Sequence, residues 1–363
     1  MKKYFAVLLV FLLLGFIQSS IAQNFQKVDS WLKHNAPEMG GRAILVVYKD
    51  GKIIYSHAED EMNGRQKMVD RFIARRQGKP VDLSNYTPDT RQAIASCSKW
   101  LSAALVMTFV DEGRLSLNDT VGKYLPVLSQ HGKGNITISQ CLSHLTGVKA
   151  PELKESMTEM QGLNSMDVAI AKIATTPMEG KPGAVFHYSN FGLQIAGAVI
   201  EKISGKSFET LFAERIARPL QMNNTDFGKG RVALPAGGAI STPNDYLNFL
   251  VMILNRGAFN GKRVLSEQSV KEMQINRLTP NVKIGYSPAE AGNFGYGYGE
   301  WVMESSITDH LSTVLTSPGL FGSFPWVDYN HHYAAFLMTF YLNNEGRNER
   351  YKDLKSLVDK AIE

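Results

Sequence analysis

The sequence predicts a mixed α/β (α+β) fold, in which an antiparallel sheet is flanked by helices and interrupted by an inserted, mostly helical subdomain. Residues 43–48 and 53–57 are rich in strand formers and flank Asp50-Gly51, a two-residue hairpin turn. Aromatic and β-branched runs return near the other end of the chain, at residues 294–303, 314–327 and 332–342. The middle of the chain instead shows helical periodicity broken by prolines. Strands at both ends around central helices predict one sheet built from both ends.

The first residues have the order of charge, apolar core and small residues that is typical of a secretory signal peptide. Met1-Lys2-Lys3 precedes an apolar run at residues 4–17, and Ser20-Ile21-Ala22 resembles a cleavage site. The run is shorter than the about 20 residues that a spanning helix needs. We therefore expect residues 1–22 to be removed, which leaves an exported protein, periplasmic or secreted, with no stable membrane anchor.

The remaining chain divides into two predicted units. Residues 23–114 and 239–363 are expected to form a discontinuous sheet domain, and residues 115–238 a helical subdomain. One helix is predicted to begin near Ser96, and two more are predicted to span residues 242–255 and 351–362. The polar stretch at residues 64–85 is predicted to be an insertion or surface loop.

Composition and charge exclude several classes of protein. The formal charge of +5 is too diffuse on a chain of 363 residues to indicate a nucleic-acid partner. A basic cluster lies within the polar stretch, close to three acidic residues, and we interpret it as part of a solvated insertion: Arg71, Arg75, Arg76 and Lys79. The motifs of nucleotide enzymes, zinc proteases and α/β-hydrolases are missing from the sequence.

Neither a disulfide nor a metal site is predicted. The two cysteines, Cys97 and Cys141, are expected to be packed thiols. His331 and His332 are adjacent, and neighbours on a strand point to opposite faces, so no metal is expected there. No cofactor is implied.

Ser96 and Lys99 are the most informative pair. A serine hydroxyl is a poor nucleophile until a base takes its proton, and an i,i+3 spacing on a helix places an amine beside the hydroxyl. Ser30 and Lys33 repeat this spacing in a segment with no other sign of chemistry. The spacing alone therefore does not predict a serine hydrolase, and the prediction rests on the motifs elsewhere in the chain that accompany Ser96.

A tyrosine is predicted to share the proton transfer with Lys99, because a free ammonium with a pKa near about 10.4 is a poor base at neutral pH. Tyr188 is the best candidate, since it follows a Pro182-Gly183 turn and precedes an apolar helix. Its neighbour Asn190 carries an amide that can both donate to and accept from a bound substrate.

The order of these and other motifs resembles the serine β-lactamase and penicillin-recognising hydrolases, specifically the class C branch with its esterase and peptidase relatives. Residues 87–90 and 94–99 are similar to the family's approach to its nucleophile, and residues 182–190 to its second catalytic motif. The similar segments continue through most of the chain, at residues 111–119, 142–147, 236–242 and 295–297. The resemblance implies a β-lactamase/transpeptidase-like fold with Ser96, Lys99 and Tyr188 as catalytic residues.

The third family motif departs from the pattern. Its counterpart is Ser317-Pro318-Gly319, which has no basic residue. The resemblance implies that this segment, with Ser317, Gly319 and Leu320, binds substrate, and that the N–H groups of Leu320 and Ser96 form an oxyanion hole. Without a cation here we expect small-molecule ester, amide or peptide substrates that need no carboxylate.

The sequence thus predicts an exported serine hydrolase that works through an acyl-enzyme. Two alternatives remain open. One is a D-alanyl carboxypeptidase, D-aminopeptidase or β-lactamase, and the other is a catalytically silent protein that binds peptidoglycan or a partner.

Overall fold

The computed structural model describes residues 24–76, 80–151, 162–228, 230, 232–307 and 311–363. The predicted signal peptide lies outside these residues. No helix within the described ranges combines the length and the apolar character needed to cross a bilayer.

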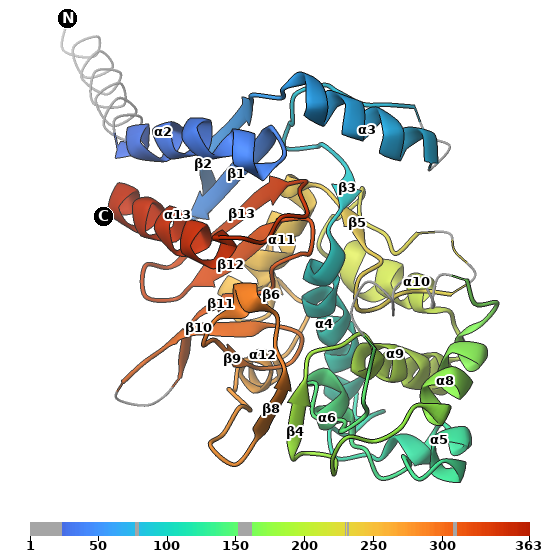
Figure 1. Ribbon diagram of the computed structural model, residues 1–363. Coiled ribbons are helices and arrows are strands. Elements are labelled where there is room, and N and C mark those ends of the chain that lie inside the picture. Colours follow the sequence, from blue (N-terminus) through green and yellow to red (C-terminus); the bar gives the residue numbers. More distant parts are fainter. Residues whose placement is uncertain (1–23, 77–79, 152–161, 229, 231, 308–310) are drawn as a thin grey trace, which may run out of the picture.

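A seven-stranded antiparallel sheet forms the centre of the fold, in the order β2-β1-β13-β12-β11-β10-β9 (Figure 1). The strands are β1 (Arg42–Lys49), β2 (Lys52–Asp60), β9 (Gly295–Tyr296), β10 (Trp301–Ser305), β11 (Ser312–Thr316), β12 (Phe324–Asp328) and β13 (Tyr333–Thr339). Because β1 pairs with β13 throughout its length, the first and last strands of the chain lie side by side. This confirms the predicted fold class and the hairpin at Asp50-Gly51.

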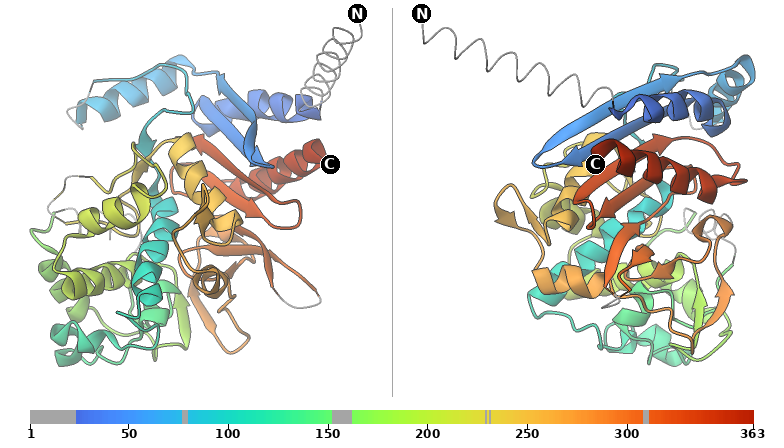
Figure 2. Two further views of the ribbon diagram at one scale, coloured as in Figure 1. Left: turned by 180° about the vertical axis from the view of Figure 1, so that it is seen from behind. Right: turned by 90° about the vertical axis from the view of Figure 1, so that its left-hand side faces the viewer.

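Helices cover both faces of the sheet (Figure 2). On one face, α2 (Gln26–Asn35) and α13 (Arg347–Ile362) pack against Tyr333, Ala335 and Leu337. On the other, α4 (Ser98–Asp111) and α11 (Pro243–Leu254) share a core with the alternate residues Ala334, Phe336 and Met338. Since side chains alternate across a strand, the fully buried β13 supplies both cores at once.

Several further helices cluster beside α4. They are α5 (Pro126–Gln130), α6 (Ile138–Leu142), α8 (Met166–Thr175), α9 (Phe191–Ser204), α10 (Phe208–Phe212) and α12 (Glu267–Met273). Elsewhere the described fold has short 3₁₀ helices at Ala36–Met39, Ala95–Cys97, Val121–Lys123 and Ala289–Ala291, and a π turn at Ala213–Ala217. Short strand pairs complete the described elements: β3 (Gln92–Ala93) with β5 (Ile240–Ser241), β4 (Val185–His187) with β8 (Lys283–Tyr286), and β6 (Ala258–Phe259) with β7 (Lys262–Arg263). The parallel β4–β8 pair joins the central helical part of the chain to its last third.

The prediction of a loop at residues 64–85 was wrong in its first half, because Gly64–Arg76 forms helix α3 at the edge of the molecule (Figure 1). Asn63 and Gln66 cap its first turn by exchanging hydrogen bonds of 2.8 and 2.9 Å between side chains and backbone N–H groups. An ion pair of 2.8 Å between Asp70 and Arg42 ties the helix to β1. Periodicity did not reveal this helix, because its large apolar side chains Met68, Val69 and Phe72 are exposed.

Helix α9 approaches α6 closely because its second residue has no side chain. A Cβ atom on Gly192 would lie 2.1 Å from the carbonyl oxygen of Cys141. The close packing matters for function, because Asn190 is the residue that precedes α9.

Replacing Gly192 with alanine is expected to lower the free energy of unfolding by about 1–3 kcal/mol through overpacking, although alanine is the better helix former. Gly64→Ala is the matched control, since its Cβ would meet nothing within 4 Å. Urea denaturation followed by circular dichroism measures both. Equal stability of the two variants would contradict the close contact.

Candidate active site

Ser96 lies in a 3₁₀ turn, Ala95–Cys97, that leads directly into α4. Ala95 has a φ of 46°, a left-handed conformation that costs energy in a residue other than glycine. The hydroxyl of Ser98 donates to the Ala95 carbonyl at 2.5 Å and accepts the Ala239 N–H at 2.9 Å. Ser98, which the sequence analysis did not single out, therefore fixes the turn that presents the nucleophile.

Lys99 is fully buried, and its amine contacts three oxygen atoms from three separate segments. It donates to Ser96 Oγ at 3.0 Å, to the carbonyl oxygen of Ala236 at 2.8 Å and to Asn190 Oδ1 at 3.3 Å. The predicted pairing of Ser96 with Lys99 is present, and Asn190 orients the amine.

Burial lowers the pKa of Lys99 to about 7, because the charged form loses its hydration. A neutral amine has two hydrogens, which Ala236 and Asn190 can accept, and a lone pair that is then free for the Ser96 proton. The same contacts thus hold the amine in either state and direct its basic form at the hydroxyl.

Tyr188 lines the same cavity as Ser96. Burial raises the pKa of its phenol, and a hydrogen bond with Ser96 offsets only part of this rise. The Lys99 amine lies 4.7 Å from the centre of the Tyr188 ring, over its face. Tyr188 therefore keeps its proton near neutral pH and is suited to donate it.

Aromatic rings on several sides hold Tyr188 in place. The ring centres of His144, Trp301 and Tyr296 lie 4.7, 5.1 and 6.0 Å from that of Tyr188. The His144 Nδ1 accepts the Ser189 N–H at 3.5 Å, and its Nε2 lies 2.9 Å from the Tyr296 hydroxyl. Because burial lowers the pKa of His144 well below its usual value, this histidine is a neutral support for Tyr188.

The third motif approaches Ser96 along the strand edge. The Ser317 hydroxyl faces two backbone carbonyls, those of Gly299 at 3.0 Å and Ser96 at 3.3 Å, so its hydrogen is used within the protein. Gly319 permits the approach, since a Cβ there would lie 2.4 Å from the Ile94 carbonyl oxygen. In the turns and loops that the structure describes, no carbonyl accepts the N–H of Ser96 or of Leu320. Both groups are therefore available to an oxyanion.

The cavity at Ser96 is small, about 20 Å³, which is room for roughly one water molecule. Its walls are Ser96, Tyr188, Pro288, Glu290, Ala291, Trp301, Pro318 and Leu320. Glu290 is the one charged residue among them, and no sequence motif pointed to it.

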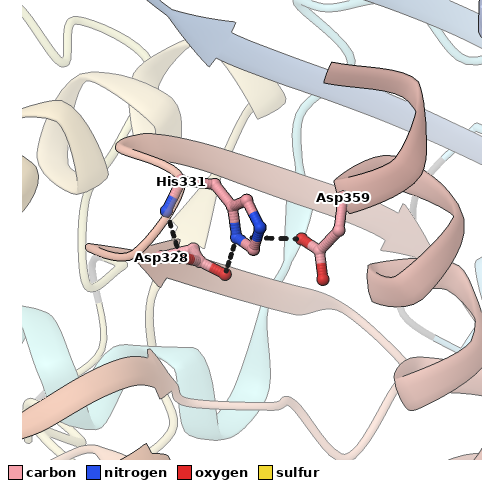
Figure 3. A group of neighbouring side chains, drawn as sticks. All are labelled: Asp328, His331 and Asp359. Carbon is pink, nitrogen blue, oxygen red and sulfur yellow. Dashed lines mark hydrogen bonds and ion pairs between the residues drawn. The ribbon is translucent and has the colours of Figure 1, made fainter. Parts of the chain in front are cut away.

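Asp328, His331 and Asp359 form a second polar cluster (Figure 3), and none of them lines the cavity at Ser96. His331 is in the turn between β12 and β13, not on a strand as the sequence suggested, and its Nδ1 lies 3.2 Å from Asp328 Oδ2. Asp328, His331 and Asp359 are close enough to share a cation. The ammonium of Lys355 already supplies one, at 2.7 Å from Asp328 and 2.9 Å from Asp359, so we interpret the cluster as a salt-bridge network.

The cysteines contribute packing rather than chemistry. Cys97 and Cys141 are free thiols with no exposed surface. Burial raises the pKa of both, which disfavours a reactive thiolate.

Comparison with known proteins identifies the family. The model of the Beta-lactamase family matches residues 36–359. Among curated proteins, Protein Rv1367c of Mycobacterium tuberculosis is 28% identical over 292 residues, which cover 66% of this chain and 72% of that protein. Protein flp of Staphylococcus aureus is 27% identical over 56% of this chain, and the match spans 38% of its length.

Solved structures share the fold over nearly the whole chain. A "putative beta-lactamase" from Bacteroides dorei aligns with a TM-score of 0.76 and 26% identity, covering 93% of this chain and 98% of that one. The hydrolase EstCE1 aligns with a TM-score of 0.70 and 18% identity over 95% and 100% of the two chains. A family VIII carboxylesterase aligns with a TM-score of 0.69 and 19% identity over 91% and 96%. The chain belongs to the Beta-lactamase family, and it is a serine hydrolase.

Proposed function

We propose that this chain is an exported serine hydrolase of the class C-related branch, which cleaves small esters or amides that need no carboxylate. The observation that carries the proposal is the geometry at Ser96, where a buried amine and a buried phenol meet one hydroxyl beside two available N–H groups. Export is supported by the signal-like order of residues 1–22.

Acylation follows from the positions of these groups. Ser96 Oγ attacks the substrate carbonyl carbon as its proton passes to the neutral Lys99 amine, and the N–H groups of Ser96 and Leu320 stabilise the oxyanion. When the tetrahedral intermediate collapses, the leaving oxygen or nitrogen takes a proton from Tyr188. Transfer of a proton from the Lys99 ammonium to the phenolate restores both groups.

Deacylation uses the same residues in reverse. Water attacks the acyl carbon and gives up a proton to Lys99, and Ser96 leaves as the alcohol after recovering a proton. The products are the free acid and the regenerated enzyme.

The preference against carboxylates rests on the third motif. Pro318 has no N–H, and the hydrogen of Ser317 is used by backbone carbonyls. A missing charged hydrogen bond is worth about 1.5–3 kcal/mol, which corresponds to about one to two orders of magnitude in rate. Structural neighbours include the family VIII carboxylesterase and a Bacillus anthracis protein described as a "putative 6-aminohexanoate-dimer hydrolase", which supports ester or amide substrates.

Ser96→Ala is expected to abolish both hydrolysis of a simple uncharged ester and labelling by a fluorophosphonate. Ser30→Ala is the matched control, because Ser30 has the same spacing to a lysine but lies exposed on α2. Intact-mass measurement after exposure to fluorophosphonate, ester and penicillin shows which reagent acylates the protein. Efficient penicillin acylation would favour the β-lactamase or peptidase alternative, and no adduct would favour a silent binding protein.

The rate of fluorophosphonate labelling is expected to rise with pH and to level off above about 7, because only the neutral Lys99 amine accepts the Ser96 proton and its pKa is about 7. Below that value the rate should fall about tenfold per pH unit. Stopped assays from pH 5 to 9, with circular dichroism to confirm folding, give the profile. A rate that stays flat down to pH 5 would contradict Lys99 as the base.

A further inference from the structure

One wall of the catalytic cavity carries a carboxylate. Glu290 lies in the 3₁₀ helix Ala289–Ala291 and lines the cavity that contains Ser96 and Tyr188. Its side chain is 15% exposed. Apart from an ion pair with Arg347, no described residue donates a hydrogen bond to its carboxylate oxygens, so they can still accept one from a ligand.

The backbone around Glu290 is held firmly. The Asn348 side chain donates to the Glu290 carbonyl at 2.7 Å, and the Tyr188 N–H donates to the Tyr286 carbonyl at 3.0 Å. The segment that carries Glu290 is therefore tied both to α13 and to the Tyr188 loop. Burial raises the pKa of the Tyr188 phenol, and the negative charge of Glu290 acts in the same direction.

Arg347 forms an ion pair with Glu290 but does not line the cavity. Arg347 Nη1 is 3.5 Å from Glu290 Oε1, but the Arg347 side chain has no exposed surface and is absent from the cavity walls. Its guanidinium donates to the carbonyls of Leu320, Tyr341 and Asn343 at 3.1, 3.2 and 2.9 Å. A substrate can thus reach the carboxylate but not the arginine.

We propose that Glu290 makes this site selective for esters or amides whose acyl group carries a positive charge, a refinement that rests on the proposed function. The carboxylate attracts the cation, and the adjacent rings of Tyr188 and Trp301 offer the aromatic faces that ammonium groups favour. The same charge repels carboxylates, in line with the missing cation at Ser317-Pro318.

Three nitrophenyl esters test the proposal. Their acyl chains end in trimethylammonium, in the isosteric tert-butyl group, or in a carboxylate. The wild-type kcat/KM is expected to be about 10- to 30-fold higher for the ammonium ester than for the tert-butyl ester, and lowest for the carboxylate. Glu290→Gln should remove this preference, which brings the kcat/KM values of the ammonium and tert-butyl esters to within about twofold of each other. Glu304→Gln is the matched control, an acid 49% exposed outside the cavity walls, and should keep the preference.

The outcomes distinguish a failure of the proposed hydrolase function from a failure of the proposed role of Glu290. If Ser96 is not labelled by fluorophosphonate and no ester is cleaved, the proposed function fails. If the esters are cleaved but wild type shows no preference for the ammonium ester, or Glu290→Gln retains it, only the role of Glu290 is overturned. Should Glu290→Gln be unstable, the wild-type preference itself decides, because a charge-based preference must shrink as salt is added.

A separate observation concerns the surface helix α3. Its side chains Met68 and Phe72, one helical turn apart, are 62% and 60% exposed. Four exposed basic residues accompany them: Arg65, Lys67, Arg71 and Arg75. The single acidic residue of the helix, Asp70, is already paired with Arg42 at 2.8 Å.

We infer that α3 docks on an anionic lipid bilayer. Basic residues around exposed large apolar side chains are typical of helices that lie in the membrane interface, where the cations contact lipid phosphates and the apolar groups enter the acyl boundary. A soluble polyanion would use the charges but would leave Met68 and Phe72 in water.

A fluorophore on Val69→Cys reports this docking directly. Labelling is selective because both natural cysteines are fully buried. An environment-sensitive dye at this position should shift to the blue with vesicles of phosphatidylglycerol and phosphatidylcholine, and not with phosphatidylcholine alone. The matched control is the dye on Ala171→Cys, exposed on α8 in the helical cluster, which should not respond.

Adding Phe72→Ser should weaken the vesicle response at least several-fold. The N-terminal apolar run is the same in every variant, so it cannot account for a difference between them. An equal response at both dye positions, no response with anionic vesicles, or an equal shift with dextran sulfate would overturn the inference.

Discussion

The site depends on one constraint, which is that a lysine amine is fully buried among three oxygen atoms. Lys99 comes from α4, Asn190 from the start of α9 and Ala236 from a loop, so the contact exists only when these segments are packed together. Burying an ammonium is costly unless each hydrogen finds an acceptor. The three oxygen atoms accept hydrogen bonds from the amine, but they do not replace its full hydration. The pKa of Lys99 therefore falls, and the neutral amine can act as a base near neutral pH.

The same burial divides the two proton-transfer roles. Taking a group out of water disfavours its charged form, and the charged form is the protonated state of Lys99 but the deprotonated state of Tyr188. One cause therefore lowers the pKa of the amine and raises that of the phenol. Burial alone thus gives the Ser96 hydroxyl a neighbouring base, Lys99, and a neighbouring acid, Tyr188.

The residues that line the cavity come from segments that are far apart in the sequence. Gly319 lets the strand edge approach the turn before α4, which brings the Leu320 N–H towards Ser96. The β4–β8 pair brings the Glu290 segment beside Tyr188. The groups that move protons thus come from α4 and from the segment that leads into α9, and the selectivity that we propose comes from the other segments that line the cavity.

The sequence by itself determined whatever depends on neighbours along the chain. The i,i+3 spacing of Ser96 and Lys99, the hairpin at Asp50-Gly51 and the place of Tyr188 before a helix are local geometry, readable from periodicity and turn residues. Tertiary structure alone decided that Glu290 lines the cavity, because segments far apart in sequence meet there through packing that no local pattern encodes. It also decided that residues 64–76 form a helix, since periodicity reveals only helices whose apolar side chains face a core, and Met68, Val69 and Phe72 of α3 are exposed.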